Sequence, residues 1–82
     1  MSIFLETAKE ILKREKKPLH YREITRIAIE KGIIKTKGVT PEASMNAIIA
    51  TDIKKKGMAS DFLKIGKGVY SLNENKIDSA FF

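Results

Sequence analysis

The chain has 82 residues, and its 16 Lys and Arg residues outnumber its 10 Asp and Glu residues, giving a formal net charge of +6. This length suits one small domain, in which a deep substrate pocket is not expected. Because there is no cysteine and only one histidine, a disulfide framework, a thiolate zinc site and a multi-histidine metal site are excluded.

The positive charge favours a nucleic-acid partner, because contacts to phosphates release counterions, although many small proteins are basic for solubility alone. No apolar run approaches the roughly 20 residues of a membrane span, and the N-terminus lacks the features of a secretory signal. We therefore expect no membrane contact. We expect a cytoplasmic, nucleoid-associated protein, or a nuclear one in a eukaryote.

Three segments have the apolar spacing of amphipathic helices, at about 2–15, 21–31 and 41–56. Pro18 and Gly32 follow the first two segments as stop signals. The third begins with Thr40-Pro41-Glu42, which suits an N-cap, a first turn and the helix dipole. Its inner face is expected to hold the residues that step by four, which are Met45, Ile49 and Ile53, with Asn46 and Asp52 flanking them.

After the third helix the composition changes to that of strands. Segments 62–65 and 69–72 are rich in β-branched and aromatic residues, and Gly66-Lys67-Gly68 lies between them, which predicts a β-hairpin. The extended stretch 17–19 supplies only a short stub of strand.

The order of helix, strand stub, helix, helix and hairpin predicts an α+β, mostly helical, winged helix-turn-helix fold. The last two helices form the helix-turn-helix and the hairpin forms the wing. We assign residues 1–72 to this domain and 73–82 to a tail that is either flexible or a truncation point. A three-helix bundle with a frayed hairpin is the alternative fold, and the oligomeric state stays open.

The sequence also resembles a known family. The resemblance is carried by PLHYREI at 18–24, GII at 32–34, GVTPEA at 38–43 and DIKKKG at 52–57, followed by Phe62, Gly68, Tyr70 and Leu72. These segments are similar to the HARE-HTH domain of restriction endonucleases, additional-sex-combs-like chromatin proteins and the RNA polymerase delta subunit. The resemblance implies a winged helix with an accessory role in DNA-associated machinery, through DNA recognition or protein docking, and no catalysis.

Two positions depart from the family's pattern. Asp61 stands where the family often has a basic residue before the first aromatic of the wing, which weakens a phosphate contact at the root of the wing. Ala50 stands where the family often has a large residue.

The expected outer face of the third helix would approach the major groove. Ser44 and Thr51 can donate and accept hydrogen bonds, whereas Ala47 and Ile48 suit a thymine methyl group. Asn46 reaches this face only if the helix is rotated from the expected orientation, so weak sequence specificity is expected. Alternatively, this face is solvent, and Ile48 contacts a protein or is loosely buried.

The lysines around the third helix and in the hairpin would hold phosphates, or would simply be solvated. The complete DNA-contacting set predicted from the sequence is Lys35, Lys37, Thr40, Ser44, Ala47, Ile48, Thr51, Lys54, Lys55, Lys64 and Lys67. His20 is expected to cap or turn the chain, and Tyr21 and Tyr70 to lie in the core or at its rim.

Enzyme motifs are missing, since there is no phosphate-binding glycine loop and no zinc-binding pair, so neither a catalytic role nor a cofactor is expected. The leading function is DNA binding, and RNA stays open. The rival is a protein-interaction module, whose partners would be RNA polymerase, chromatin or restriction-enzyme components. A continuous basic face around the third helix and the wing would favour DNA. An apolar patch centred on Ile48 would favour a protein.

Overall fold

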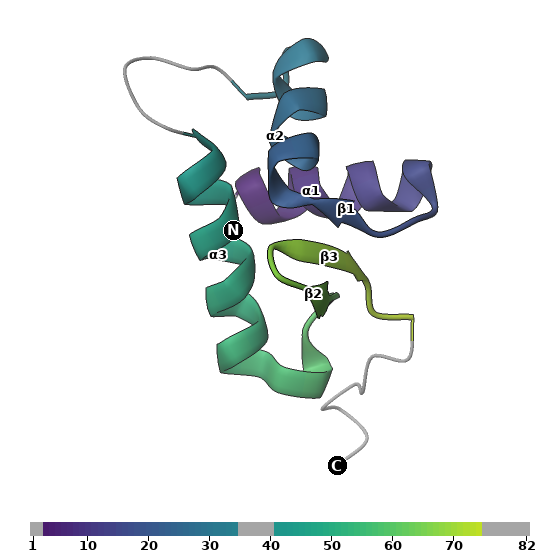
Figure 1. The fold of residues 1–82 in the computed structure, drawn as a ribbon, viewed down its shortest axis with the longest axis vertical. Coiled ribbons are helices and arrows are strands. Elements are labelled where there is room, and N and C mark those ends of the chain that lie inside the picture. The colour runs from purple at the N-terminus through teal and green to yellow at the C-terminus, as the bar shows by residue number, and fades with distance from the viewer. Residues whose placement is uncertain (1–2, 35–40, 75–82) are drawn as a thin grey trace.

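A computed structural model describes residues 3–34 and 41–74 of the chain (Figure 1). Within these ranges the elements, in chain order, are α1 (Ile3–Glu15), β1 (Leu19–His20), α2 (Tyr21–Glu30), α3 (Pro41–Lys56), the 3₁₀ turn η1 (Gly57–Ala59), β2 (Phe62–Gly66) and β3 (Val69–Leu72). This is the mostly helical α+β winged helix that the sequence predicted. No helix in the described ranges is long and apolar enough to cross a membrane.

Local signals set the ends of α2. The His20 Nδ1 atom accepts a hydrogen bond from the Arg22 backbone N–H at 3.2 Å, which confirms the predicted capping role of this histidine. Beyond the last turn, Gly32 takes a φ of 70°, a left-handed conformation that glycine adopts without steric cost. The helix therefore ends where its sequence predicts.

The three strands form one antiparallel sheet in the order β1-β3-β2, so β3 is the central strand. Leu19 lies opposite Tyr70, and Phe62 lies opposite Leu72. The predicted stub at 17–19 is shifted in the structure. Lys17 and Pro18 precede the strand, since proline has no N–H to donate and is disfavoured within a ladder.

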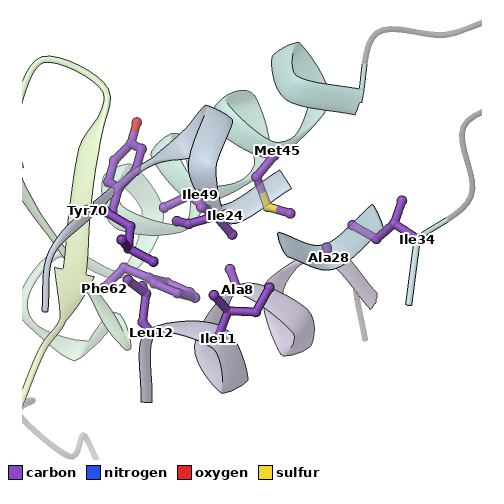
Figure 2. Packing of buried hydrophobic residues seen from close by; sticks show 11 residues of the cluster. Ala8, Ile11, Leu12, Ile24, Ala28, Ile34, Met45, Ile49, Phe62 and Tyr70 are labelled. Carbon is purple, nitrogen blue, oxygen red and sulfur yellow. The ribbon is translucent and has the colours of Figure 1, made fainter. Parts of the chain in front are cut away.

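The core lies where the three helices meet one face of the sheet (Figure 2). Its buried members are Ala8, Ile11, Leu12, Leu19, Ile24, Ala28, Ile34, Met45, Ile49, Phe62 and Tyr70. The Tyr70 ring lies at the edge of this cluster, and its hydroxyl points away from the cluster (Figure 2). Tyr70 is thus a core residue with a polar tip, as the sequence suggested.

The buried face of α3 differs from the predicted one. Met45 and Ile49 are fully buried, Ile53 is half-buried and packs against the core, and Asp52, which was expected beside this face, is buried within it. This burial is possible because the Asp52 carboxylate accepts a hydrogen bond from the Ser60 hydroxyl at 2.5 Å and lies 3.2 Å from the Lys56 ammonium. The helix is therefore turned so that Asp52 faces inward.

The same serine joins α3 to the wing. Besides donating to Asp52, the Ser60 hydroxyl accepts a hydrogen bond from the Phe62 N–H at 3.1 Å. Asn73, just after β3, donates from its backbone N–H to the Asp61 carbonyl and from its side chain to the Met58 and Ser60 carbonyls. These bonds fix the root of the wing against the end of α3.

The turn of the wing packs on the start of α2. The Gly68 carbonyl accepts a hydrogen bond from the Tyr21 N–H at 2.9 Å, and Gly68 itself has a φ of 73°. A Cβ atom at this position would lie 2.9 Å from both His20 Nε2 and Tyr21 Cε2. Only glycine fits this close approach without displacing those rings.

Candidate nucleic-acid interface

The outward face of α3 carries mostly small side chains. Its exposed residues are Ala43, Ser44, Ala47, Ala50, Thr51, Lys54, Lys55 and Lys56. Because the central positions of this face are alanines, the helix can approach a flat or grooved partner closely. Of the predicted contact residues on α3, all are exposed except Ile48, which is half-buried.

Between α3 and the wing lies a hollow of about 520 Å³, here called the α3–wing hollow. Three cations from different elements line it: Arg22 at the start of α2, Lys64 on β2 and Lys67 in the wing turn. Asn46 and Ala50 of α3 form its opposite wall. None of its described lining residues is acidic, so the hollow is a site of concentrated positive charge.

Asn46 is held in a fixed orientation within this hollow. Its Oδ1 atom accepts a hydrogen bond from the Tyr70 hydroxyl at 2.6 Å, so the amide NH₂ is the end left to donate outward. Burial raises the pKa of Tyr70 above its ordinary value, with a smaller contribution from Tyr21, so the hydroxyl keeps its proton at neutral pH. The wing core thus orients a donor on α3.

The two arginines of α2 on this side have different partners. The Arg22 guanidinium lies 6.0 Å from the Tyr21 ring centroid and has no described salt bridge. Arg26 instead binds Glu23 at 2.7 Å and Glu30 at 2.8 Å, and its hydrogen bond and charge lower the pKa of Glu23. Arg22 is therefore the α2 cation available to a ligand.

One comparison with known proteins bears on this geometry. The HARE-HTH family model, described as the HTH domain of ASXL and restriction endonuclease proteins, matches residues 3–74. The chain belongs to the HARE-HTH family. No curated protein and no solved structure matches it. The HARE-HTH domain is a helix-turn-helix module, of a kind that generally binds nucleic acid rather than catalysing a reaction.

The predicted contact residues of this HARE-HTH domain fall on two flanks of α3. Lys64 and Lys67 line the α3–wing hollow, whereas four others line a hollow of about 310 Å³ on the other flank, against Leu5 of α1. Those four are Ala47, Ile48, Thr51 and Lys55. Lys35, Lys37 and Thr40 lie outside the described residues, and Ser44 and Lys54 are exposed on α3.

Seven of the nine residues that line the α3–wing hollow were missing from the predicted contact set, among them Arg22, Asn46 and Ala50. Asn46 and Ala50 face the wing because burial of Asp52 turns α3. Arg22 arrives there because β1 pairs with β3 and brings the start of α2 beside the wing turn. Only Asn46 had a signal in the sequence, as the one base-reading side chain near the predicted face.

Asp61 does not line the α3–wing hollow of the HARE-HTH domain. Its carboxylate lies 3.7 Å from the Lys9 ammonium of α1. The described residues also contain no cluster of three or more His, Asp or Glu side chains that could hold a metal ion. No described carboxylate therefore lies among the cations that line the α3–wing hollow.

Proposed function

We propose that this HARE-HTH domain binds duplex DNA, as an accessory module of transcription, chromatin or restriction machinery, and that it is not an enzyme. In this proposal α3 lies in the major groove and the wing follows the adjacent phosphates. The observation that carries it is the α3–wing hollow, where Arg22, Lys64 and Lys67 surround the Asn46 amide without an acidic neighbour.

The chemistry of the hollow suits phosphates more than base edges. Lysine ammonium groups and the outward NH₂ of Asn46 are all donors, and phosphate oxygens are acceptors. A bidentate contact to adenine would require both the amide oxygen and the amide nitrogen of Asn46, and Tyr70 already binds the oxygen. We therefore propose binding with weak sequence preference.

The rival function, a protein-interaction module without DNA contact, has less support at α3. It required an apolar patch centred on Ile48. That side chain is half-buried, and its hollow holds Leu5 together with the polar residues Thr51 and Lys55. The face of α3 that points outward is lined by alanines and lysines instead.

The test is fluorescence anisotropy of the full chain with a short random duplex across a salt series. Binding should weaken steeply with salt, and the double variant Lys64→Gln/Lys67→Gln should flatten the dependence of log K on log salt by about 2, because each phosphate contact contributes about 0.9. The matched control is Arg14→Gln/Lys31→Gln, which removes the same charge from exposed residues outside the hollow and outside the described salt bridges.

Two outcomes would contradict the proposal. Equal losses in both double variants would mean that only net charge attracts DNA and that the hollow makes no contact. An absence of binding at low salt would favour the rival function, in which the domain binds a protein partner.

A further inference from the structure

A second basic hollow, separate from the α3–wing hollow, borders the hairpin. It has a volume of about 530 Å³ and lies between the C-terminal end of α1 and the hairpin. Leu63 lines this hollow, whereas its neighbour Lys64 lines the α3–wing hollow. Leu63 points to the face opposite Lys64, but Leu72 pairs with Phe62 and points to the same face as Lys64, so this hollow takes residues from both faces of the sheet and shares none with the α3–wing hollow. This site is here called the α1–sheet hollow.

The α1–sheet hollow combines a basic rim with an apolar floor. Lys13, Lys16 and Lys17 come from the end of α1 and the turn that follows it, and Pro18, Leu63 and Leu72 supply apolar surface. Leu63 is 40% exposed, so its side chain is open to a ligand in the hollow. The α1 end that carries this rim points away from α3 (Figure 1).

The three lysines take no part in the described salt bridges, which use Lys9, Arg26 and Lys56 instead. One carboxylate, that of Glu74, also lines the hollow. Three cations against one anion leave the site positively charged, so a ligand with carboxylates matches it.

Lys16 has a further unusual property. Its φ is 55°, and the other described residues with left-handed backbone are all glycines: Gly32, Gly57 and Gly68. A lysine at such a position is strained, because its Cβ crowds the backbone, and glycine would be the stabilising choice. This conformation ends α1, since the Lys16 N–H donates to the Leu12 carbonyl at 3.0 Å, and the side chain lines the basic rim.

We propose that the α1–sheet hollow binds an acidic peptide segment of a partner protein that carries one large apolar side chain. The apolar side chain would lie on Pro18, Leu63 and Leu72, and the flanking carboxylates would pair with the lysines. Nucleic acid fits less well, because a phosphate backbone has no apolar group to bury on Pro18, Leu63 and Leu72, and no described residue of the hollow is aromatic, so unpaired bases have nothing to stack on. With DNA bound at the separate α3–wing hollow, as the proposed function has it, the domain is an adapter that links the two.

The first experiment is an NMR titration of the ¹⁵N-labelled full chain with a short glutamate-rich peptide containing one central Phe. The amides of Lys13, Lys16, Leu63 and Ser71 should shift. A matched peptide with Ala in place of Phe should bind several-fold more weakly, because it cannot cover the apolar floor. Equal binding of the two peptides would overturn the proposal, as would shifts confined to Lys64 and Lys67.

Variants separate this site from the DNA site. Lys16→Gly should raise the melting temperature, because it relieves the left-handed strain, yet weaken peptide binding about two- to fivefold, the range of one exposed ion pair. Lys16→Arg should keep wild-type binding. Leu63→Gln changes an exposed residue, so it should fold normally and lose peptide binding.

The double variant Lys64→Gln/Lys67→Gln should bind the peptide as the wild type does, whatever its effect on DNA. Unchanged peptide affinity in both Lys16→Gly and Leu63→Gln would overturn the proposal. Duplex DNA that shifts the amides of Lys13, Lys16 and Leu63 would also overturn it, since nucleic acid would then be what covers this face.

Discussion

The two basic hollows of this domain have three cations each but differ in the other residues that line them. In the α3–wing hollow the cations surround a fixed amide donor, Asn46, and no described carboxylate is present. In the α1–sheet hollow they border exposed apolar surface at Leu63 and Leu72, together with Glu74. The positive charge attracts anions to both hollows, and the other lining residues determine which anion binds.

The difference also shows why net charge alone says little about function. A formal charge of +6 attracts phosphates and carboxylates equally. The donor of Asn46 among the cations of one hollow favours a ligand made of acceptors, and the apolar floor of the other favours a ligand that also has an apolar group to bury. The following substitutions should affect the two hollows unequally, and they are ordered by expected effect.

Gly68→Ala should have the largest effect, and it should act on the α3–wing hollow. The new Cβ would lie 2.9 Å from His20 Nε2 and would adopt a φ of 73°. We expect a loss of about 2–4 kcal/mol in the free energy of unfolding, from backbone strain and displacement of the rings. Urea unfolding measures it.

The control for that substitution is Gly66→Ala in the same turn. Its Cβ would meet only the Val69 Cβ at 3.9 Å, an ordinary contact, and Gly66 is not among the left-handed residues. Its stability should stay close to that of the wild type. A Gly68→Ala variant as stable as Gly66→Ala would show that the wing turn does not pack closely against the start of α2.

Ser60→Ala should have an intermediate effect on both hollows, because it loosens the root of the wing. It leaves the buried Asp52 carboxylate and the Phe62 N–H each without the Ser60 hydroxyl. We expect a loss of about 1–3 kcal/mol, the cost of leaving buried polar groups unsatisfied. Thermal unfolding measures it, and Ser44→Ala, on the exposed face of α3, should change stability by no more than about 0.5 kcal/mol.

Tyr70→Phe should have the smallest effect, about 1 kcal/mol, because it removes one hydrogen bond to Asn46 and keeps the ring. Burial raises the pKa of Tyr70 in the folded state. The contribution of the protonated Tyr70 hydroxyl to folding stability is therefore complete below the unfolded-state pKa of about 10. It is lost as the pH rises through the higher folded-state pKa.

The stability difference between the wild type and Tyr70→Phe should consequently narrow at strongly alkaline pH. Urea unfolding over a pH series checks this. The variant Tyr21→Phe keeps the Tyr70 hydroxyl, so its free energy of unfolding should still fall at alkaline pH. A difference that stays constant with pH would mean that the hydroxyl is not held as the structure places it.

Helix ends and the fold itself were predictable because their signals are local. His20 caps α2 from the adjacent residue, and Gly32 ends the same helix by its own conformational freedom. The hairpin followed from two strand-forming segments around glycines. The family resemblance, based on motifs spread along the chain, is confirmed by the match over residues 3–74.

The rotation of α3 was not predictable, because it depends on a contact distant in the chain. The spacing placed Asp52 only beside the inner face, and its bonds to Ser60 and Lys56 are what make full burial of the carboxylate favourable. The α3–wing hollow was missed for a related reason, since Arg22 reaches it through the pairing of β1 with β3. Sequence spacing shows which residues share a helix face but not which other element that face meets.

The central place of β3 has a consequence for how the wing opens. A hairpin joined only by its own turn can fray while the helices remain intact, but β3 is also bonded to β1, which directly precedes α2. Separating the wing therefore requires breaking a strand pair that ties together the two halves of the chain. Amide hydrogens of β3 should then exchange with solvent only through global unfolding, so that both hollows are present together or lost together.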